Sequence, residues 1–335
     1  MTHYKTETLD LRLMDCMDAL RDMPDNSVDA IVTDPPYYKV VDSDWDKQWK
    51  TREDFLNWLE SMAIEWRRVL KPNGSLYVFC YSTQSARIEV MLEKHFNILN
   101  QIVWAKPTGY WAKQCKEEQR IYFPATERII FAEHYGADNM AKGESGWVAK
   151  CDKLRGFVFE PLRSYLVAEK EKSGLTNNQL LKLSSTFHTH YWGRSQWALP
   201  TEKDYNAFRK ACNKIAFLRE YEDLRREYED LRRPFDIVSL RHTTDVWTYA
   251  TEQGEIGRHP CQKPIALMDQ IILSSTKRGD LIFDPFSGSG STAISALKNG
   301  RRFVGTELDP HYFSESIERI TRETAQFELP LSISP

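Results

Sequence analysis

Short apolar runs alternate with longer segments of helical periodicity in both outer thirds of the chain. An apolar residue recurs every three or four positions across residues 52–70, which predicts an amphipathic helix that ends at the turn Lys71-Pro72-Asn73-Gly74. Runs rich in β-branched and aromatic residues predict strands at residues 28–33, 75–80, 98–105, 128–132, 281–283 and 303–306. Because these strands alternate with helices, the pattern predicts an α/β fold with a mostly parallel sheet.

The strand pattern is interrupted in the middle of the chain. It stops near residue 135 and resumes near 280, and much of the intervening stretch is helical in pattern and rich in Tyr and Trp. We therefore expect a first part at residues 1–150, a mainly helical inserted domain at 151–240, and a second part of the sheet domain at 241–335.

The insert contains a short repeat. The sequence "REYEDLR" occurs twice in succession, at 219–225 and 226–232, which places Tyr and Leu at alternating spacings of three and four. Two heptads are too few to predict a coiled coil, so the favoured interpretation is a solvated helix that packs one stripe on its own domain. The alternative is a contact between two copies of the chain, in a homodimer.

Composition narrows the class of protein. Of 335 residues, 41% are hydrophobic and 28% are charged, which is ordinary for a globular protein. No apolar run reaches the roughly 20 residues that span a bilayer, and the polar N-terminus does not resemble a signal peptide, so we expect a cytoplasmic protein without a membrane partner. The six cysteines form no Cys-x-x-Cys pair, which argues against a metal site and against a disulfide framework.

The segment "VTDPPYY", residues 32–38, follows a predicted strand directly. Pro35 and Pro36 remove two backbone donors and fix two φ angles, so the chain cannot continue as a central strand. The result is a stiff turn with the Asp34 carboxylate at its mouth and the Tyr37 ring beyond it. This combination suits a site that holds a flat, polar group.

A second motif, "LIFDPFSGSGSTAISALKNG", begins at Leu281. A strand ends at Asp284, a loop with Gly288 and Gly290 follows, and a helix begins near Ser291. The next strand ends in Glu307, an acid placed to bind ribose hydroxyls. Glycines of this spacing occur in dinucleotide sites, so the motif alone indicates a cofactor that contains adenosine and leaves NAD and S-adenosylmethionine both open.

Together, the two motifs resemble those of the amino-methylating DNA methyltransferases that use S-adenosylmethionine. Asp-Pro-Pro-Tyr is their catalytic motif, and Asp-Pro-Phe-x-Gly-x-Gly is their cofactor loop. The order here, catalytic motif, insert and cofactor loop, is similar to that of the permuted β group. The segments "VLKPNGSLYVF", "IVWAKP" and "HPCQKPIALMDQII" also follow in the family order. The resemblance implies a Rossmann-like, circularly permuted methyltransferase sheet whose insert is the target recognition domain.

The resemblance also implies roles for individual residues. Asp34 would accept a hydrogen bond from the target amine, the Pro35 carbonyl could accept the second N–H, and Tyr37 would stack on a flipped base, with Pro36 completing the catalytic motif. Lys263 would help to hold the methionine carboxylate, and Glu307 the ribose. Asp15 and Cys16 would lie near the adenine of the cofactor. The remaining residues implied around the cofactor are Asp284, Pro285, Phe286, Ser287, Gly288, Ser289, Gly290 and Thr292.

One position departs from the family pattern. "HPCQKP" has Cys261 where the family usually has Thr. A Pro-Cys pair carries the nucleophile in cytosine-C5 methyltransferases, but here one small side chain replaces another at a cofactor-side position. We therefore interpret Cys261 as a substitution and not as a nucleophile.

The resemblance predicts methylation of adenine N6, because cytosine-N4 enzymes more often carry Ser in place of Asp34. Cytosine N4 stays open, since one oxygen acceptor can serve either amine. Two other classes fit less well. An NAD-dependent oxidoreductase leaves the Asp-Pro-Pro-Tyr segment unexplained, and a non-catalytic DNA-binding regulator leaves the intact Asp34 and glycines unexplained.

The insert is the expected reader of double-stranded DNA. It has a small excess of Lys and Arg inside an acidic chain of net charge −3. Residues from Gly174 onward are compatible with a helix-turn-helix, whose second helix would present His188, His190, Tyr191 and Arg194, with Gln196 just beyond. The alternative is that Tyr191 and the tryptophans form the small core of the insert. A protein of this class is expected near the nucleoid of a bacterial cell.

Overall fold

The computed structural model describes residues 2–40, 44–107, 117, 120, 122, 124–137, 146–184, 188–194, 197–251 and 262–325. The chain divides into two compact units. The first, called the sheet unit, comprises Met1–Glu133 and Pro234–Pro335; the second, called the helical unit, comprises His134–Arg233.

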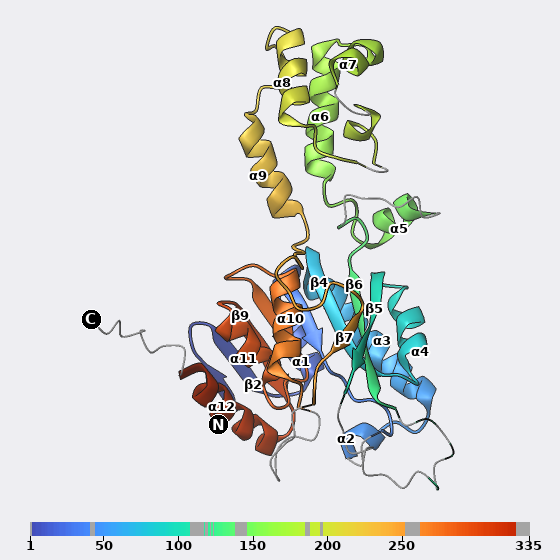
Figure 1. The fold of residues 1–335 in the computed structure, drawn as a ribbon, viewed down its shortest axis with the longest axis vertical. Coiled ribbons are helices and arrows are strands. Elements are labelled where there is room, and N and C mark those ends of the chain that lie inside the picture. Colours follow the sequence, from blue (N-terminus) through green and yellow to red (C-terminus); the bar gives the residue numbers. More distant parts are fainter. Residues whose placement is uncertain are drawn as a thin grey trace, which may run out of the picture. The chain divides into compact units, whose positions relative to one another are not determined.

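A nine-stranded mixed sheet forms the centre of the sheet unit (Figure 1). Its order is β1-β2-β9-β8-β3-β4-β6-β5-β7. β4 and β6 pair antiparallel, as do β5 and β6 and the edge pair β1 and β2, and the other neighbours are parallel. The strands are β1 (His3–Lys5), β2 (Leu9–Leu13), β3 (Val28–Thr33), β4 (Leu70–Tyr81), β5 (Asn97–Ala105), β6 (Thr126–Glu133), β7 (Val246–Thr248), β8 (Leu281–Asp284) and β9 (Arg302–Glu307).

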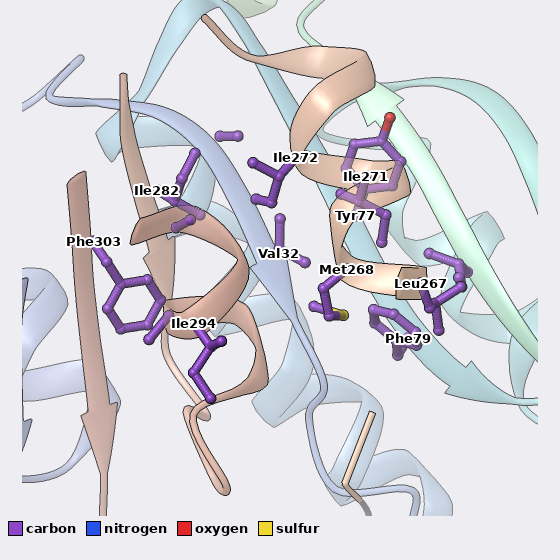
Figure 2. Packing of buried hydrophobic residues seen from close by; sticks show 14 of the residues in the cluster. Val32, Tyr77, Phe79, Leu267, Met268, Ile271, Ile272, Ile282, Ile294 and Phe303 are labelled. Carbon is purple, nitrogen blue, oxygen red and sulfur yellow. The ribbon is translucent and has the colours of Figure 1, made fainter. Parts of the chain in front are cut away.

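Helices cover both faces of this sheet. One buried cluster joins the sheet to α10, α11 and α12, and Figure 2 shows Ile271, Ile282 and Ile294 among its members. A second cluster joins the sheet to α1, α3 and α4. Thr51 and Asp54 form a reciprocal capping box that starts α3. The helices are α1 (Cys16–Asp22), α2 (Asp44–Lys47), α3 (Arg52–Val69), α4 (Ser85–Leu92), α10 (Ile265–Ser275), α11 (Ser291–Lys298) and α12 (Pro310–Ala325).

The α/β class and all six predicted strands are confirmed, but β1, β2 and β7 were not predicted. β1 and β7 are only three residues long, too short for a clear alternating pattern. The predicted turn at Lys71–Gly74 was wrong in form. Val28 pairs with Leu70 and Ala30 with Ser75, so these residues make an irregularity within β4.

Two neighbouring strands meet at a switch in topology. β8 and β3 are adjacent and parallel, with Ala30 opposite Ile282. From β8 the chain crosses through α11 to β9 on one side, whereas from β3 it crosses through α3 to β4 on the other. Crossovers that diverge in this way leave a crevice at the carboxyl ends of the strands, where α/β proteins bind ligands.

The helical unit is built around aromatic side chains. Its elements are α5 (Trp147–Leu154), α6 (Glu160–Ser173), α7 (Asn177–Leu183), a short 3₁₀ helix (His188–Tyr191), α8 (Glu202–Ala211) and α9 (Tyr221–Leu231). The unit begins before residue 151 because Tyr135 and Trp147 are buried in its core. It ends at Arg233, before the predicted boundary at 240, because the chain then returns to the sheet unit, where Asp236 N donates to Ser274 O.

The first helix of the predicted helix-turn-helix is present as α7, capped by Thr176, but the predicted second helix was wrong. A single turn of 3₁₀ helix follows α7 in place of a recognition helix, because Tyr191 turns inward, is 3% exposed and donates its hydroxyl to Asp204. The interpretation of the heptads as a solvated helix is confirmed. In α9, Leu224 is fully buried, while Tyr228 and Leu231 pack against the same core.

Candidate functional site

The turn after β3 carries the Asp-Pro-Pro-Tyr motif. Immediately beyond it, Tyr38 and Lys39 have φ of 63° and 61°, a left-handed backbone that non-glycine residues rarely adopt. The buried carboxylate of Asp46 holds this turn by accepting from Tyr38 N at 2.7 Å and from Val40 N at 2.6 Å. The turn is therefore fixed by its surroundings.

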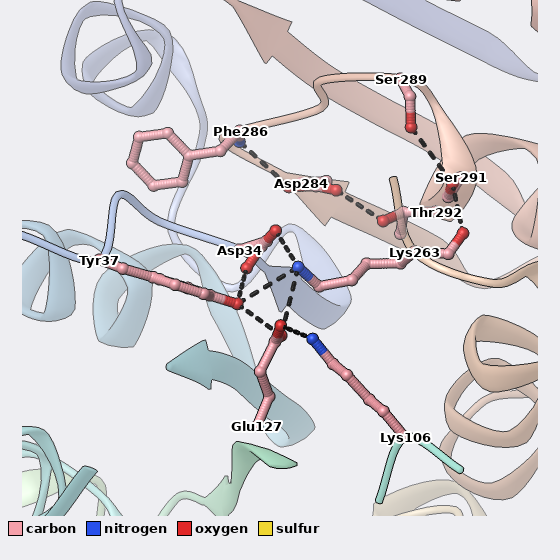
Figure 3. Close-up of polar contacts among 10 residues, drawn as sticks. All are labelled: Asp34, Tyr37, Lys106, Glu127, Lys263, Asp284, Phe286, Ser289, Ser291 and Thr292. Atoms are coloured by element: carbon pink, nitrogen blue, oxygen red, sulfur yellow. Dashed lines mark hydrogen bonds and ion pairs between the residues drawn. The ribbon is translucent and has the colours of Figure 1, made fainter. Parts of the chain in front are cut away.

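Asp34 lies in a cluster of two carboxylates and two ammonium groups (Figure 3). Lys263 Nζ donates to Asp34 Oδ2 at 2.5 Å and lies 3.6 Å from Glu127 Oε2. The Tyr37 hydroxyl lies 2.6 Å from Asp34 Oδ1 and 2.9 Å from Glu127 Oε2, and Lys106 Nζ donates to Glu127 Oε1. Because Tyr37 has one proton to donate, the two carboxylates compete for it.

The sheet explains how these residues converge. β4 and β6 are antiparallel with Tyr81 opposite Glu127, so the start of β6 lies at the edge where β3 and β4 end. Lys106 follows β5, whose last residue pairs with Thr126. Sequence reasoning assigned no role to Glu127 or Lys106. The signal available for Lys106 was its place in "IVWAKP", whereas Glu127 became visible only with the strand register.

The two carboxylates of the cluster shift in opposite directions. Burial raises the pKa of Asp34, and the nearby negative charge of Glu127 adds to this, against the attraction of Lys263. Burial also acts to raise the pKa of Glu127, but the positive charges of Lys263 and Lys106 outweigh it and lower that pKa. Asp34 is therefore the member of the pair that more readily holds a proton.

The loop after β8 is organised around Asp284. This carboxylate accepts from the Thr292 hydroxyl at 2.6 Å and from Phe286 N at 3.0 Å. Its burial raises the pKa of Asp284 to about 7. Gly290, with φ of 77°, then begins α11 as its N-cap.

Glu307, at the end of β9, is held by backbone donors. Gly288 N donates to Oε2 at 2.9 Å, and Leu308 N and Asp309 N donate to Oε1. Burial raises the pKa of Glu307. Gly288 itself has φ of 48°, which is left-handed and favours glycine.

A cavity of about 440 Å³ connects these elements, a volume within the roughly 300–1,000 Å³ typical of small-molecule sites. One buried polar atom of the loop supports a ligand here: Ser287 Oγ has no hydrogen-bond partner among the described residues. Of the predicted catalytic and cofactor residues, all but Gly290 line the cavity: Asp15, Cys16, Asp34, Pro35, Pro36, Tyr37, Lys263, Asp284, Pro285, Phe286, Ser287, Gly288, Ser289, Thr292 and Glu307.

Three of these residues have distinct environments. Asp15 is the N-cap of α1 and accepts from Met17 N, while burial raises the pKa of the Cys16 thiol to about 12. Lys263 was predicted to hold the methionine carboxylate, but its ammonium group lies against Asp34 and Tyr37. Its backbone carbonyl accepts from the hydroxyl of Ser291, at the start of α11.

Among the residues predicted to contact DNA, Arg194 is held by two acids of the helical unit. Arg194 pairs with Asp152 at 2.6 Å and with Glu160 at 3.1 Å. His188 and His190 lie in the 3₁₀ helix. Gln196 and Cys261 fall outside the described residues. The contacts with DNA that were predicted for His188, His190, Arg194 and Gln196 stay predictions.

Among the residues that the structure describes, no three His, Cys, Asp or Glu side chains gather as a metal site would require. No helix among them is long and apolar enough to cross a membrane.

Comparison with known proteins places this geometry in a family. A family model of N6/N4 methylases, described as DNA methylase, matches residues 28–318. DNA adenine methyltransferase YhdJ from Escherichia coli strain K12 is 26% identical over 324 residues, covering 95% of this chain and 85% of the relative.

Two solved structures share the fold. The PvuII cytosine-N4-specific DNA methyltransferase aligns with a TM-score of 0.57 and 15% identity, over 99% of this chain and 90% of its own. A Thermus thermophilus protein solved with S-adenosyl-L-methionine aligns with a TM-score of 0.51 and 21% identity, over 93% of both chains. Since the family model spans both motifs that line the cavity, the chain belongs to the N6/N4 DNA methylase family and is an S-adenosylmethionine-dependent DNA methyltransferase.

Proposed function

We propose that the protein transfers a methyl group from S-adenosylmethionine to the N6 amine of an adenine extruded from duplex DNA at a specific sequence. The observation that carries this proposal is the position of Asp34. Its carboxylate lines the same cavity as the Asp284–Thr292 loop and Glu307, within the cluster formed by Lys263, Tyr37 and Glu127.

The chemistry follows from the weakness of the nucleophile. An exocyclic amine conjugated to a ring has a delocalised lone pair, and an acceptor on its N–H favours the form in which that pair can attack. Asp34 supplies this acceptor, and the Pro35 carbonyl is available for the second N–H. When bound, S-adenosylmethionine supplies an electrophilic methyl group. The proton that the amine loses can pass to Asp34, whose pKa is raised.

Holding the cofactor falls to the second motif. Gly288 and Ser287 bring the backbone close to the ligand, Glu307 takes the ribose hydroxyls, and Asp284 fixes the loop through Thr292 and Phe286. Asp15 and Cys16 lie at the adenine end of the cavity in this assignment. The remaining loop residues line the methionine end.

Glu127 and Lys106 act through their neighbours. Glu127 contacts the Tyr37 hydroxyl and lies near Lys263, while Lys106 holds Glu127 from the other side. Together they position the Tyr37 ring, which is 8% exposed, and the ammonium group that faces Asp34. We assign both as positioning residues.

The choice of adenine rests on Asp34 in the motif and on the adenine methyltransferase among the relatives. Cytosine N4 is the alternative, favoured by the fold shared with the PvuII enzyme. The helical unit is assigned to target recognition, because it is the separate body inserted between the two motifs. An inactive methylase frame that only binds DNA would contradict the proposal.

The test is direct. Purified protein is incubated with unmethylated DNA and methyl-labelled S-adenosylmethionine, and the DNA is digested to nucleosides. We expect label in N6-methyl-2′-deoxyadenosine, and sequencing for modified bases then gives the recognition site. Label in N4-methyl-2′-deoxycytidine would refute the base assignment, and cofactor binding without label in DNA would refute the activity.

A further inference from the structure

The backbone between α8 and α9 has a conformation that costs free energy. Asn213, Lys214 and Phe217 have φ of 49°, 61° and 58°. Non-glycine residues rarely adopt positive φ, and a bulky ring such as that of Phe217 is an outlier there. Such strain persists where the surrounding structure fixes it, and it clusters at functional sites. Residues 213–218 are called the strained loop.

The loop is anchored from beneath. Phe217 is fully buried, with its ring 5.6 Å from Tyr205 and 5.8 Å from Phe208, and its backbone N donates to Glu169 Oε2 at 2.5 Å. Glu169 is itself 2% exposed. The Phe217 ring, the Glu169 carboxylate and the backbone hydrogen bonds that end α8, such as Lys214 N to Arg209 O, therefore hold the loop. Its outward-facing side chains are available for contact.

Those side chains are turned outward. Ile215 is 65% exposed and Leu218 is 58% exposed, while Asn213 and Lys214 are also exposed. Two large apolar side chains, three residues apart, therefore share one exposed segment of strained backbone. A group of exposed apolar side chains can serve as a contact surface.

The charged side chains of the helical unit indicate what kind of partner the strained loop would contact. Most arginines of the helical unit have acidic partners, as Arg194 has Asp152 and Arg209 has Glu220. Lys210, at the end of α8, and Lys214, in the strained loop, are exposed. Lys214 lies near enough to Glu220 for its charge to help lower the pKa of that acid, whose main partner is Arg209. Exposed cations beside apolar side chains and the amide of Asn213 suit a polyanion that also offers apolar surface, which is the chemistry of duplex DNA.

We propose that the strained loop contacts duplex DNA, with Lys210 and Lys214 on phosphates and Ile215 and Leu218 against sugars and base edges in a groove. This inference deepens the proposed function, because it names the surface through which the helical unit meets the substrate. It replaces the helix-turn-helix with a loop whose shape is fixed before DNA arrives.

The strain itself supplies a clean test. Asn213→Gly and Lys214→Gly remove two exposed side chains at positions where glycine fits the backbone better, so the melting temperature should hold or rise. DNA affinity should nonetheless fall, and the slope of log K against log salt should shrink by about 0.9 for the missing phosphate contact. Ile215→Ser with Leu218→Ser should weaken target-duplex binding about tenfold, because both substitutions remove apolar surface from the interface with DNA.

Matched controls lie on α4, where exposed Arg87 and Val90 (62% exposed) provide the same chemistry on ordinary helical backbone. Arg87→Ala with Val90→Ser should leave DNA affinity unchanged. Calorimetry with S-adenosylmethionine should give the wild-type value for every variant.

Two outcomes would overturn the inference. Unchanged affinity and salt slope in both loop variants would remove the loop from the DNA interface. A change in sedimentation with unchanged DNA affinity would make the loop a contact between copies. Either result leaves the proposed function standing if the wild-type protein methylates DNA; a wild-type protein without methylation fails the proposed function instead.

Discussion

In both units a buried acid fixes a strained turn, but the side chains of the two turns lie in different places. In the sheet unit, Asp46 holds Tyr38 and Val40, and the turn directs Tyr37 into the cavity and packs Tyr38 on Phe55. In the helical unit, Glu169 holds Phe217, and the turn leaves Ile215 and Leu218 in water. A hydrogen bond from the turn to a buried carboxylate therefore helps to form a cavity in the sheet unit and an exposed surface in the helical unit.

The charges of the two units differ in a parallel way. Asp34 sits beside a second carboxylate at the wall of a cavity, and its pKa is raised. Glu160 lies at the surface of the helical unit with Arg163 and Arg194, whose hydrogen bonds lower its pKa to about 2. A carboxylate whose pKa is raised by burial is suited to exchange a proton during a reaction. A carboxylate that arginines keep ionised contributes to structure.

A large effect should come from releasing each turn separately. Asp46→Ala should lower kcat roughly 10- to 100-fold, because the Tyr37 ring and Asp34 lose their fixed geometry. Its DNA affinity should stay at the wild-type value. Glu169→Ala should do the reverse, with weaker DNA binding and a cofactor affinity that calorimetry does not distinguish from wild type. If both variants lose the same property, the division between pocket and surface is wrong.

Removing the positive neighbour and the negative neighbour of Asp34 should shift the pKa of Asp34 in opposite directions. Lys263 lowers the pKa of Asp34, so Lys263→Met should raise that pKa and move the acidic limb of kcat/KM to higher pH. Glu127 raises the pKa of Asp34, so Glu127→Gln should move the limb to lower pH. Glu160→Gln, in the helical unit, should move it in neither direction. Profiles of methyl transfer against pH for the three variants measure this, and shifts of the same sign would exclude Asp34 as the titrating group.

Arg194 should behave as a structural residue. Arg194→Ala removes two partly exposed ion pairs, each worth about 0.2–1 kcal/mol, so the melting temperature should fall by a few degrees. Specific DNA affinity should change little beyond that loss of stability. A loss of target over non-target affinity at an unchanged melting temperature would return Arg194 to the DNA interface.

The two units should also differ in the pH dependence of their stability. The folded pKa of Asp284 is raised from 3.8 to about 7, so the stability it contributes is complete below about 4 and is lost as pH rises through about 7. The folded pKa of Glu160 is lowered from 4.5 to about 2, so its contribution is present above 4.5 and is lost as pH falls toward 2. Hydrogen exchange resolved by segment should show Asp284→Asn and Glu160→Gln flattening opposite limbs, each in its own unit.

Much of the sheet unit could be predicted from sequence because its chemistry follows strand ends. Asp34 and Asp284 come directly after apolar runs, and parallel neighbouring strands bring such ends together. Glu127 could not be found in this way, since only the antiparallel register of β6 places it beside Tyr37. Lys263 was predicted as a site residue, but its ammonium group contacts Asp34. That orientation depends on burial and not on spacing in the sequence.

The helical unit was less predictable for a physical reason. Aromatic residues in a small helical core and aromatic residues on a DNA surface have the same local spacing. Tyr191 and Trp197 are buried in the core of the helical unit, which is incompatible with the predicted recognition helix. We therefore assign the DNA surface to the strained loop. Positive φ at Asn213 and Lys214 leaves no signature in the residue types, apart from the tolerance of Asn for that conformation.

The central claim is that Asp34 activates the target amine within a cavity that holds S-adenosylmethionine. Asp34→Ala tests it most directly, with calorimetric cofactor binding and methyl transfer to DNA measured on the same preparation. Lys263 keeps Glu127 as a neighbour in this variant, so the cavity wall should persist. The account predicts near wild-type cofactor affinity with transfer reduced roughly 100- to 1,000-fold or more. Transfer at a near wild-type rate would contradict it.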